Sequence, residues 1–362
     1  MSRATDAIQA DDAESAARAL EARLGPGVLY PISYAAPREL IVDRVPDKTE
    51  AVAGLMSKNK AGGYRFTAGQ QDAYYDQYRR AYFAVTRKRG GWDCLRHIEI
   101  MLNGCLPLLE NLDACPPWTM THYPKALLRS IADRYQRLAD DEASDAADAI
   151  DPSEYERDAW AILAHLRERQ TTESIARDVL RWMGAADAKR VLFLTPVRKP
   201  NYACDLLFHG LRSLLGAGCV DIYKRWWMFD SLVRERYRGL YGNGFTYAGM
   251  LPDIDVDRSD VRGAVRRRAF DLVVYGCVEY GTPYLGTVRR YYDRNQVALI
   301  DGGDLDTLPG TPGRVRTRRS LAQRWACADA RLFKHGVYFK REIADHTLNT
   351  AERLADAAGL LR

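Results

Sequence analysis

The sequence lacks the features by which membrane and secreted proteins are recognised. It contains no run of about 18 apolar residues, the length that a membrane-spanning helix needs. The segment 1–24 carries acidic residues early and no apolar centre of the kind that signal peptides have. We therefore expect an amphipathic helix over 6–24 and a soluble, cytoplasmic protein.

The sequence also lacks the spacings that are typical of disulfide frameworks and metal sites. Its seven cysteines include no Cys-x-x-Cys pair, and its six histidines show no metal-ligand spacing. An odd and scattered set of cysteines is typical of a reducing compartment. Carboxylates alternate from Asp253 to Asp257, but they follow Pro252 in a polar stretch that we interpret as a solvated loop. We expect neither a metal requirement nor a prosthetic group.

What the chain does contain is enough apolar side chain for two domains. It has 362 residues, of which 47% are hydrophobic and 28% charged, and a formal net charge of +5. This mild positive charge permits a phosphate-bearing partner without demanding nucleic acid. The acidic segment 139–150, free of aromatics, indicates a linker. The predicted parts are an N-terminal helix (1–24), a first α/β domain (25–140), the linker with two helices (141–187), a second α/β domain (188–343) and a C-terminal helix (344–362).

The stretch 81–125 has the clearest pattern of the first domain. An apolar run (81–86) leads into a basic, glycine-rich turn (87–91), a helical pattern (93–102) and a second apolar run (105–109). This order is typical of a parallel β-α-β unit, whose ligands bind at the carboxyl ends of the strands. We expect the turn to bind phosphate through backbone N–H groups and basic side chains. Alternatively, Asp93 only caps the helix.

The segment from Arg96 to Pro107 resembles a known element. It matches the Arg-His-x-Glu-(four residues)-Gly-Cys-x-Pro pattern in the donor-binding domain of GT-B glycosyltransferases, most closely the exostosin-like ones. The resemblance covers about 78–125 and implies that Glu99 holds the ribose of a nucleotide-sugar, with Arg96 and His97 as the basic pair before it. In the alternative interpretation, Glu99 is a solvated helix residue and the basic pair are its surface neighbours.

The donor site predicted in this way needs no metal. Arg87, Lys88 and Arg96 would neutralise a diphosphate of UDP or GDP type. Tyr64, beside a Gly-Gly turn, is a candidate for stacking on the base, unless it is an ordinary half-buried strand tyrosine. The preceding lysine-rich segment 48–60 is interpreted as helix or loop. The predicted donor-binding residues are Thr86, Arg87, Lys88, Arg96, His97, Glu99 and Tyr64.

The second domain is predicted to be Rossmann-like, since unbroken apolar strands alternate with helical stretches from Lys189 onward. An inverting transfer would need a general base here, although the sequence leaves the stereochemistry open. Each candidate could instead have a structural role. Asp301 and Asp304, for example, flank a Gly-Gly turn and could simply cap it. The glycine-rich loop 241–249 matches no nucleotide motif and receives no role. The candidates are Glu279, Asp301, Asp304 and His209, the last on one helix face with Asp205 and Arg212.

The order of the two domains is unusual for the family that the chain resembles. Segment 330–343 is similar to the end of the acceptor domain in related bacterial glycosyltransferases, where a run similar to 30–37 follows it. Here that run stands near the start. The resemblance therefore implies two Rossmann-like domains facing across a cleft in a circularly permuted GT-B chain, with the donor domain first. This hypothesis requires Tyr30 and Glu342 on the same side of the molecule.

The sequence therefore predicts a nucleotide-sugar-dependent glycosyltransferase acting on a glycan, a lipid-linked saccharide or a protein; its oligomeric state stays open. One alternative is a DNA glycosyltransferase acting on hydroxymethylated bases. The basic clusters 262–268 and 313–320 could follow phosphates, although a solvated helix face or a contact with an anionic membrane would look the same. The other alternative is a non-catalytic nucleotide- or sugar-binding module.

Overall fold

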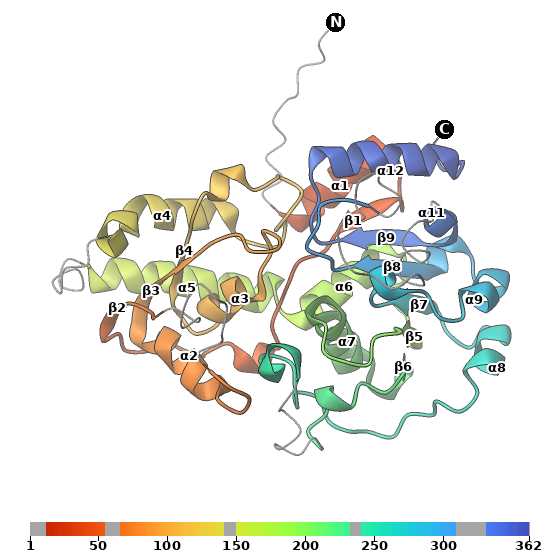
Figure 1. Cartoon of the computed structure of the whole chain (residues 1–362), viewed down its shortest axis with the longest axis horizontal. Helices are drawn as coiled ribbons and strands as arrows, with labels where there is room; N and C mark the ends of the chain where they lie inside the picture. The colour runs from red at the N-terminus through yellow and green to blue at the C-terminus, as the bar shows by residue number, and fades with distance from the viewer. Residues whose placement is uncertain (1–11, 55–65, 141–149, 232–239, 309–330, 362) are drawn as a thin grey trace, which may run out of the picture.

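The computed structural model describes residues 12–54, 66–140, 150–231, 240–308 and 331–361. This part of the chain forms two lobes, one around a three-stranded parallel sheet and the other around a six-stranded parallel sheet (Figure 1). The α/β class predicted from the sequence is confirmed. Tyr64 and the basic cluster 313–320 lie outside the described residues.

The first lobe contains the predicted β-α-β unit. Its sheet has the order β2-β3-β4, and Phe83 of β3 is in register with Leu106 of β4. The helix between these strands ends at Met101, and Gly104 in the turn that follows has a φ of 66°, which suits a residue without a Cβ. Two further helices, α4 and α5, pack against β4. The elements are β2 (Glu50–Val52), α2 (Gln71–Arg80), β3 (Ala81–Thr86), α3 (Leu95–Met101), β4 (Leu106–Leu109), α4 (Lys125–Asp140) and α5 (Pro152–Arg169).

The second lobe has the strand order β1-β9-β8-β7-β5-β6, and every residue of these strands is buried. Helices α1, α8, α9, α11 and α12 cover one face of the sheet, and α6 and α7 cover the other. The strands are β1 (Leu29–Pro31), β5 (Val191–Leu194), β6 (Cys219–Ile222), β7 (Leu272–Tyr275), β8 (Val297–Asp301) and β9 (Val337–Lys340). The helices are α1 (Ala13–Leu24), α6 (Thr172–Trp182), α7 (Tyr202–Leu215), α8 (Val261–Arg266), α9 (Leu285–Tyr291), α11 (Arg331–His335) and α12 (Asp345–Ala357).

Two of the predicted ranges differ from the observed sheets. Strand β1 falls within the predicted first domain, yet it pairs with β9 in the second lobe, with Tyr30 in register with Phe339. Residues 48–60 contain the strand β2 where a helix or loop was predicted. Both strands have three residues, too few to show the alternation by which strands are recognised.

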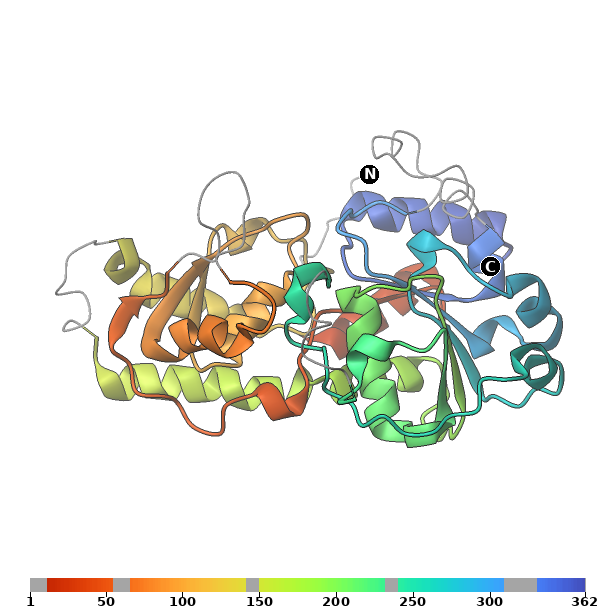
Figure 2. The same ribbon diagram turned by 60° about the horizontal axis from the view of Figure 1, so that its bottom comes forward.

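The chain passes between the lobes at two neighbouring points. One connection follows β1, and the other joins α5 to α6. They are hydrogen-bonded to each other, since Ala36 N donates to Gln170 O at 3.3 Å and Thr172 N donates to Ala36 O at 2.9 Å. One hydrophobic core runs from the first sheet to the α6–α7 face of the second. The lobes therefore pack against one another, as the turned view in Figure 2 shows. Within the described residues, every helix is too short or too polar to cross a membrane.

Candidate functional site

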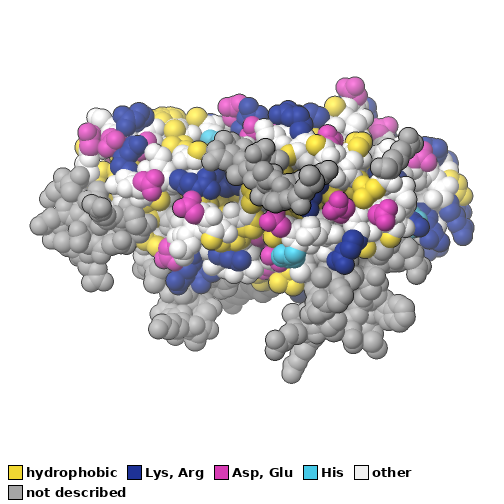
Figure 3. Space-filling model, turned by 90° about the horizontal axis from the view of Figure 1, so that it is seen from above, with side chains coloured by type: hydrophobic (Ala, Val, Ile, Leu, Met, Phe, Trp, Pro, Cys, Tyr) yellow, Lys and Arg dark blue, Asp and Glu magenta, His cyan; other side chains and the backbone are white. Residues whose placement is uncertain are grey.

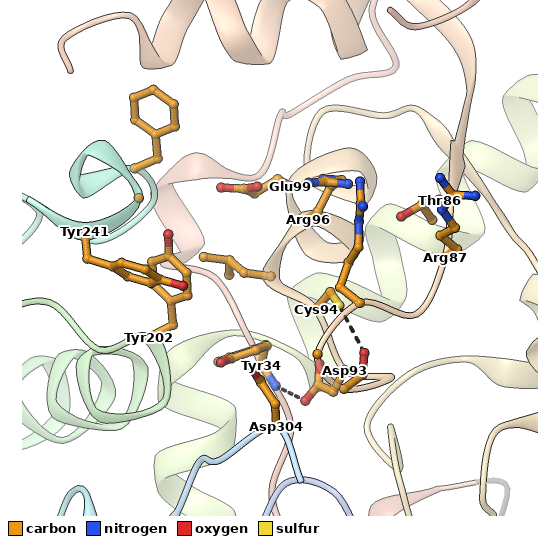
Figure 4. Close-up of a pocket in the computed structure, with 16 residues that line it drawn as sticks. Tyr34, Thr86, Arg87, Asp93, Cys94, Arg96, Glu99, Tyr202, Tyr241 and Asp304 are labelled. Atoms are coloured by element: carbon orange, nitrogen blue, oxygen red, sulfur yellow. Dashed lines mark hydrogen bonds between the residues drawn. The ribbon is translucent and has the colours of Figure 1, made fainter. Parts of the chain in front are cut away.

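A cavity of about 230 Å³ lies between the lobes, where β3 ends (Figure 4). The turn after β3 and helix α3 form its wall on the first lobe. The second lobe contributes Tyr202, the loop around Tyr241 and the side chain of Asp304. The predicted donor-binding residues that line the cavity are Thr86, Arg87, Arg96 and Glu99, and the predicted base that does so is Asp304.

The first-lobe wall is cationic. Arg87, Arg89 and Arg96 all line the cavity, and Arg87 makes a loose ion pair with Glu110 at 3.7 Å. Within the described part of the chain, neither Arg89 nor Arg96 has an ion-pair partner, and the buried Nε of Arg96 has no hydrogen-bond partner. The pKa of Arg89 is lowered by burial and then by its two arginine neighbours. An anion in the cavity would relieve this repulsion.

Two predicted donor-binding residues lie outside the cavity wall. Lys88 places its Nζ 5.2 Å from the centre of the Trp92 ring. His97 is buried below the turn, with its ring nitrogens 3.0 Å from Thr86 Oγ1 and 3.0 Å from Trp92 O. Burial lowers the pKa of His97 to about 4. His97 is therefore neutral at pH 7 and supports the turn, without adding the charge that the sequence-based prediction gave it.

Glu99 is held by a side chain from each lobe. It is only 5% exposed, so the interpretation as a solvated helix residue is wrong. Tyr74 donates its hydroxyl hydrogen to Glu99 Oε2 at 2.8 Å, and Thr246 donates to Oε1 at 2.8 Å. Burial raises the pKa of Glu99, while both hydrogen bonds and the charge of Arg96 oppose the rise. A carboxylate offers about four acceptor positions, so the two bonds leave room for a ligand hydroxyl.

Asp93 does not cap α3, so that alternative is wrong as well. The N-cap residue is Cys94, whose side chain makes no capping hydrogen bond. The buried carboxylate of Asp93 instead accepts hydrogen bonds from Tyr34 N at 2.8 Å and from the Tyr123 hydroxyl at 2.7 Å. Burial raises the pKa of Asp93 to about 7, although the nearby Arg341 guanidinium opposes this shift.

The end of β9 holds the turn of the first lobe. Glu342 accepts hydrogen bonds from Trp92 N at 3.1 Å and from Asp93 N at 2.9 Å. These two amides belong to the region that was expected to bind phosphate, and in the structure a carboxylate of the second lobe occupies them. Arg341 beside Glu342 donates to the carbonyl of Asp93 and to the carboxylate of Asp304. Any anion in the cavity would therefore depend on the arginine side chains more than on these amides.

The two glycines of the turn lie where the second lobe approaches most closely. A Cβ at Gly90 would lie 2.4 Å from Asp304 Oδ2, and a Cβ at Gly91 would lie 2.3 Å from Glu342 Oε1. Neither glycine has a positive φ, so backbone conformation does not explain them. The Gly-Gly pair thus allows the two lobes to meet.

The other predicted bases are buried away from the cavity. Asp301 accepts hydrogen bonds from Tyr338 at 2.8 Å, Lys340 at 3.1 Å and Gly303 N at 3.0 Å, the last being the turn contact foreseen as its structural alternative. Glu279 is buried as well, and burial followed by the charge of Asp301 raises its pKa to about 8. Neither lines the cavity.

His209 is also remote from the cavity. Its Nδ1 lies 2.8 Å from Thr172 Oγ1, between α7 and α6, and burial lowers its pKa. The i, i+4 spacing placed His209 on one helix face with Asp205, but that face packs inside the lobe. Asp205 lies there beside Arg225, which donates to its carboxylate. Helical spacing shows which residues share a face but does not reveal what the face contacts.

Sequence reasoning missed the contribution of the loop 240–249. Tyr241 is 59% exposed, its ring lies 5.4 Å from that of Tyr202, and both line the cavity. Figure 4 shows these tyrosines on the side opposite Thr86 and Arg87. The available signal was a cluster of glycines and aromatics, whose spacing matches no nucleotide motif.

The described residues contain no group of three or more His, Cys, Asp or Glu side chains arranged to hold a metal ion. Comparison of the chain with protein-family models, with curated proteins and with solved structures gave no match.

Proposed function

We propose that this protein is a glycosyltransferase that binds the diphosphate of a nucleotide-sugar at the arginine wall of the cavity. The observation that carries the proposal is that Arg89 and Arg96 line the cavity without a carboxylate partner in the described part of the chain. Arg96 is partly buried, and a partly buried cation is costly unless it is paired. One guanidinium group can donate two parallel hydrogen bonds to the oxygens of a phosphate. Two arginines therefore suit a diphosphate as their counter-ion.

The position of Glu99 is a second observation that supports a nucleotide-sugar as the ligand. It lines the same cavity, and its carboxylate keeps acceptor positions that suit sugar hydroxyls. A ligand that satisfies both the arginines and Glu99 carries phosphate and hydroxyl groups close together. Nucleotide-sugars of UDP or GDP type meet this description.

The pairing of β1 with β9 supports the permuted GT-B arrangement. Tyr30 is in register with Phe339, so Tyr30 lies near Glu342, as a chain cut between 343 and 30 requires. In this arrangement the first lobe is the donor domain and the second lobe is the acceptor domain. The cavity between the two lobes is then the place of transfer.

Asp304 is the second-lobe carboxylate that we propose as general base. Its side chain is 63% exposed and lines the cavity, in contrast to those of Asp301 and Glu279. In an inverting transfer, the bond between the anomeric carbon and the phosphate oxygen breaks while the acceptor oxygen bonds to that carbon. The acceptor proton passes to Asp304, and the arginines stabilise the diphosphate that leaves.

A thermal-shift screen of UDP- and GDP-sugars tests the proposal. A ligand at 100 times its dissociation constant stabilises the folded protein by about 2.7 kcal/mol. We expect one nucleotide-sugar to raise the melting temperature of the wild type and to lose this effect in Arg96→Ala. The matched control is Arg289→Ala, since Arg289 is an exposed arginine of α9 outside the cavity. If no nucleotide-sugar shifts the wild type, the proposal is wrong.

The DNA-directed alternative receives less support. The described basic cluster 262–268 lies on and after α8, at the outer edge of the second lobe (Figure 1). Arg267 pairs with Asp260 at 3.0 Å and Arg268 with Asp293 at 4.0 Å. On the face shown in Figure 3, basic and acidic side chains are intermixed. Duplex DNA binding that weakens steeply with salt would nevertheless favour this alternative.

A further inference from the structure

The loop 240–249 of the second lobe reaches the first lobe and touches the proposed donor site there. Thr246 is fully buried, and its hydroxyl donates to Glu99 Oε1 at 2.8 Å. Tyr75 Oη lies 2.9 Å from the same hydroxyl oxygen. Because the single hydroxyl hydrogen of Thr246 goes to Glu99, Tyr75 is the donor in this second bond. Thr246 N also donates to Gln71 Oε1, at 2.7 Å.

The backbone of Thr246 has an uncommon conformation. Its φ is +75°, a region that a β-branched residue rarely adopts. Gly242, Asn243 and Gly244 before it also have positive φ values. In this conformation the amide and the hydroxyl of Thr246 both point into the first lobe, at α2 and α3. Glycine or asparagine would suit the backbone better, so a threonine here indicates that the hydroxyl and the methyl group are needed.

We infer that Thr246 is a positioning residue for donor binding: its hydroxyl, supplied by the second lobe, fixes the Glu99 carboxylate in the form that accepts sugar hydroxyls. This inference rests on the proposed function. Two hydroxyl donors, Tyr74 and Thr246, each occupy one oxygen of Glu99. They fix the orientation of the carboxylate and leave one acceptor position on each oxygen for a ligand.

The hydrogen bonds also favour the ionised form of Glu99. Burial favours its neutral form, and the bonds from Tyr74 and Thr246 oppose that effect. Loss of the Thr246 hydroxyl would raise the pKa of Glu99 further. A protonated Glu99 has fewer acceptor positions, so a donor sugar would bind less tightly. Since Thr246 belongs to the second lobe, donor affinity then depends on the contact between the lobes.

The test uses three substitutions at one position in the full-length chain. Thr246→Val keeps the shape and removes the hydroxyl, Thr246→Ser keeps the hydroxyl, and Thr246→Ala removes it while relieving the branched side chain at positive φ. The dissociation constant of the nucleotide-sugar found in the thermal-shift screen is measured by calorimetry from pH 5 to pH 8. Thermal unfolding checks that each variant is folded. If Thr246→Val does not fold, Thr246→Ala is used as the hydroxyl-free variant.

We expect Thr246→Val and Thr246→Ala to bind the nucleotide-sugar about tenfold more weakly at neutral pH, and Thr246→Ser to stay within about threefold of the wild type. In the first two variants the loss of affinity on acidification should begin at higher pH. Donor KM should rise while kcat at saturating donor and pH 8 stays close to the wild-type value. Wild-type affinity and pH profile in both hydroxyl-free variants would overturn the inference and leave the proposed function standing. No binding by the wild type would overturn the proposed function itself.

Discussion

Arg341 of the second lobe donates a hydrogen bond to the backbone carbonyl of Asp93 in the first lobe. The same guanidinium donates to Gly302 O at 3.1 Å and to Glu342 Oε1 at 3.0 Å, and it lies 4.6 Å from the centre of the Tyr34 ring. One buried cation thus ties the glycine turn of the first lobe to the ends of β8 and β9. This contact fixes the relative position of the two walls of the cavity.

Replacing Arg341 by methionine should destabilise the protein by about 3–5 kcal/mol, because the buried Glu342 would lose its ion-pair partner at 3.0 Å. Urea unfolding measures the change. The matched control is Arg18→Met, which removes an exposed helix pair with Glu14 (3.3 Å) and should cost about 0.5 kcal/mol or less. Equal losses in the two variants would show that Arg341 does not hold the lobes together.

The glycines of the turn should respond differently to alanine. A Cβ at Gly91 meets Glu342, which is buried and already accepts two backbone hydrogen bonds. A Cβ at Gly90 meets Asp304, whose 63% exposed side chain has room to move. We expect Gly91→Ala to lose about 2–3 kcal/mol of unfolding free energy and Gly90→Ala less than about 1 kcal/mol. The reverse order in urea unfolding would contradict the described contact.

The sequence was sufficient to predict the local elements near the site. β3 covers the predicted range 81–86, and α3 and β4 lie within the ranges predicted for them. The reason is that β4 is buried throughout and β3 is mostly buried, and that Gly104, at a positive φ, lies in the turn after the intervening helix. Such signals are local and can be recognised in a single sequence.

The contacts between the lobes could not be predicted in this way. Glu342 binds backbone amides about 250 positions earlier, and Thr246 binds Glu99 across a separation of 147 residues. Backbone amides carry no sequence signature, and the loop 240–249 owes its position to several positive φ values. The basic turn therefore pointed correctly to a cavity-lining segment, but not to the carboxylate that binds the two amides directly after it.

The pH dependence of the free energy of unfolding should reflect the titration of Asp93. Its pKa is raised from 3.8 to about 7 in the folded protein, so the folded state binds a proton that the unfolded state releases. The resulting stabilisation is present below pH 4 and is lost as pH rises through 7. Asp93→Asn mimics the protonated form: its amide can donate to Tyr123, and its oxygen can accept from Tyr34 N.

Between pH 5 and pH 8, the free energy of unfolding of Asp93→Asn should therefore rise relative to that of the wild type. The gain is roughly 3 kcal/mol at most, since about two pH units separate pH 5 from the folded pKa and each unit corresponds to about 1.4 kcal/mol. Urea unfolding of both proteins at the two pH values measures it. Parallel pH profiles would mean that the Asp93 carboxyl is ionised throughout this range.

Asp301 and Asp304 were equal candidates for the general base, and a pair of asparagine substitutions should separate them. Asp301→Asn leaves Lys340 buried without its ion-pair partner at 3.1 Å and should cost about 3–5 kcal/mol of stability. Its kcat, measured per folded molecule, should stay near that of the wild type. Asp304→Asn should lower kcat about 100-fold while the melting temperature changes little, because the exposed asparagine can still accept a hydrogen bond from Arg341. A large loss of kcat in folded Asp301→Asn, with none in Asp304→Asn, would move the catalytic base to the buried carboxylate and away from the cavity.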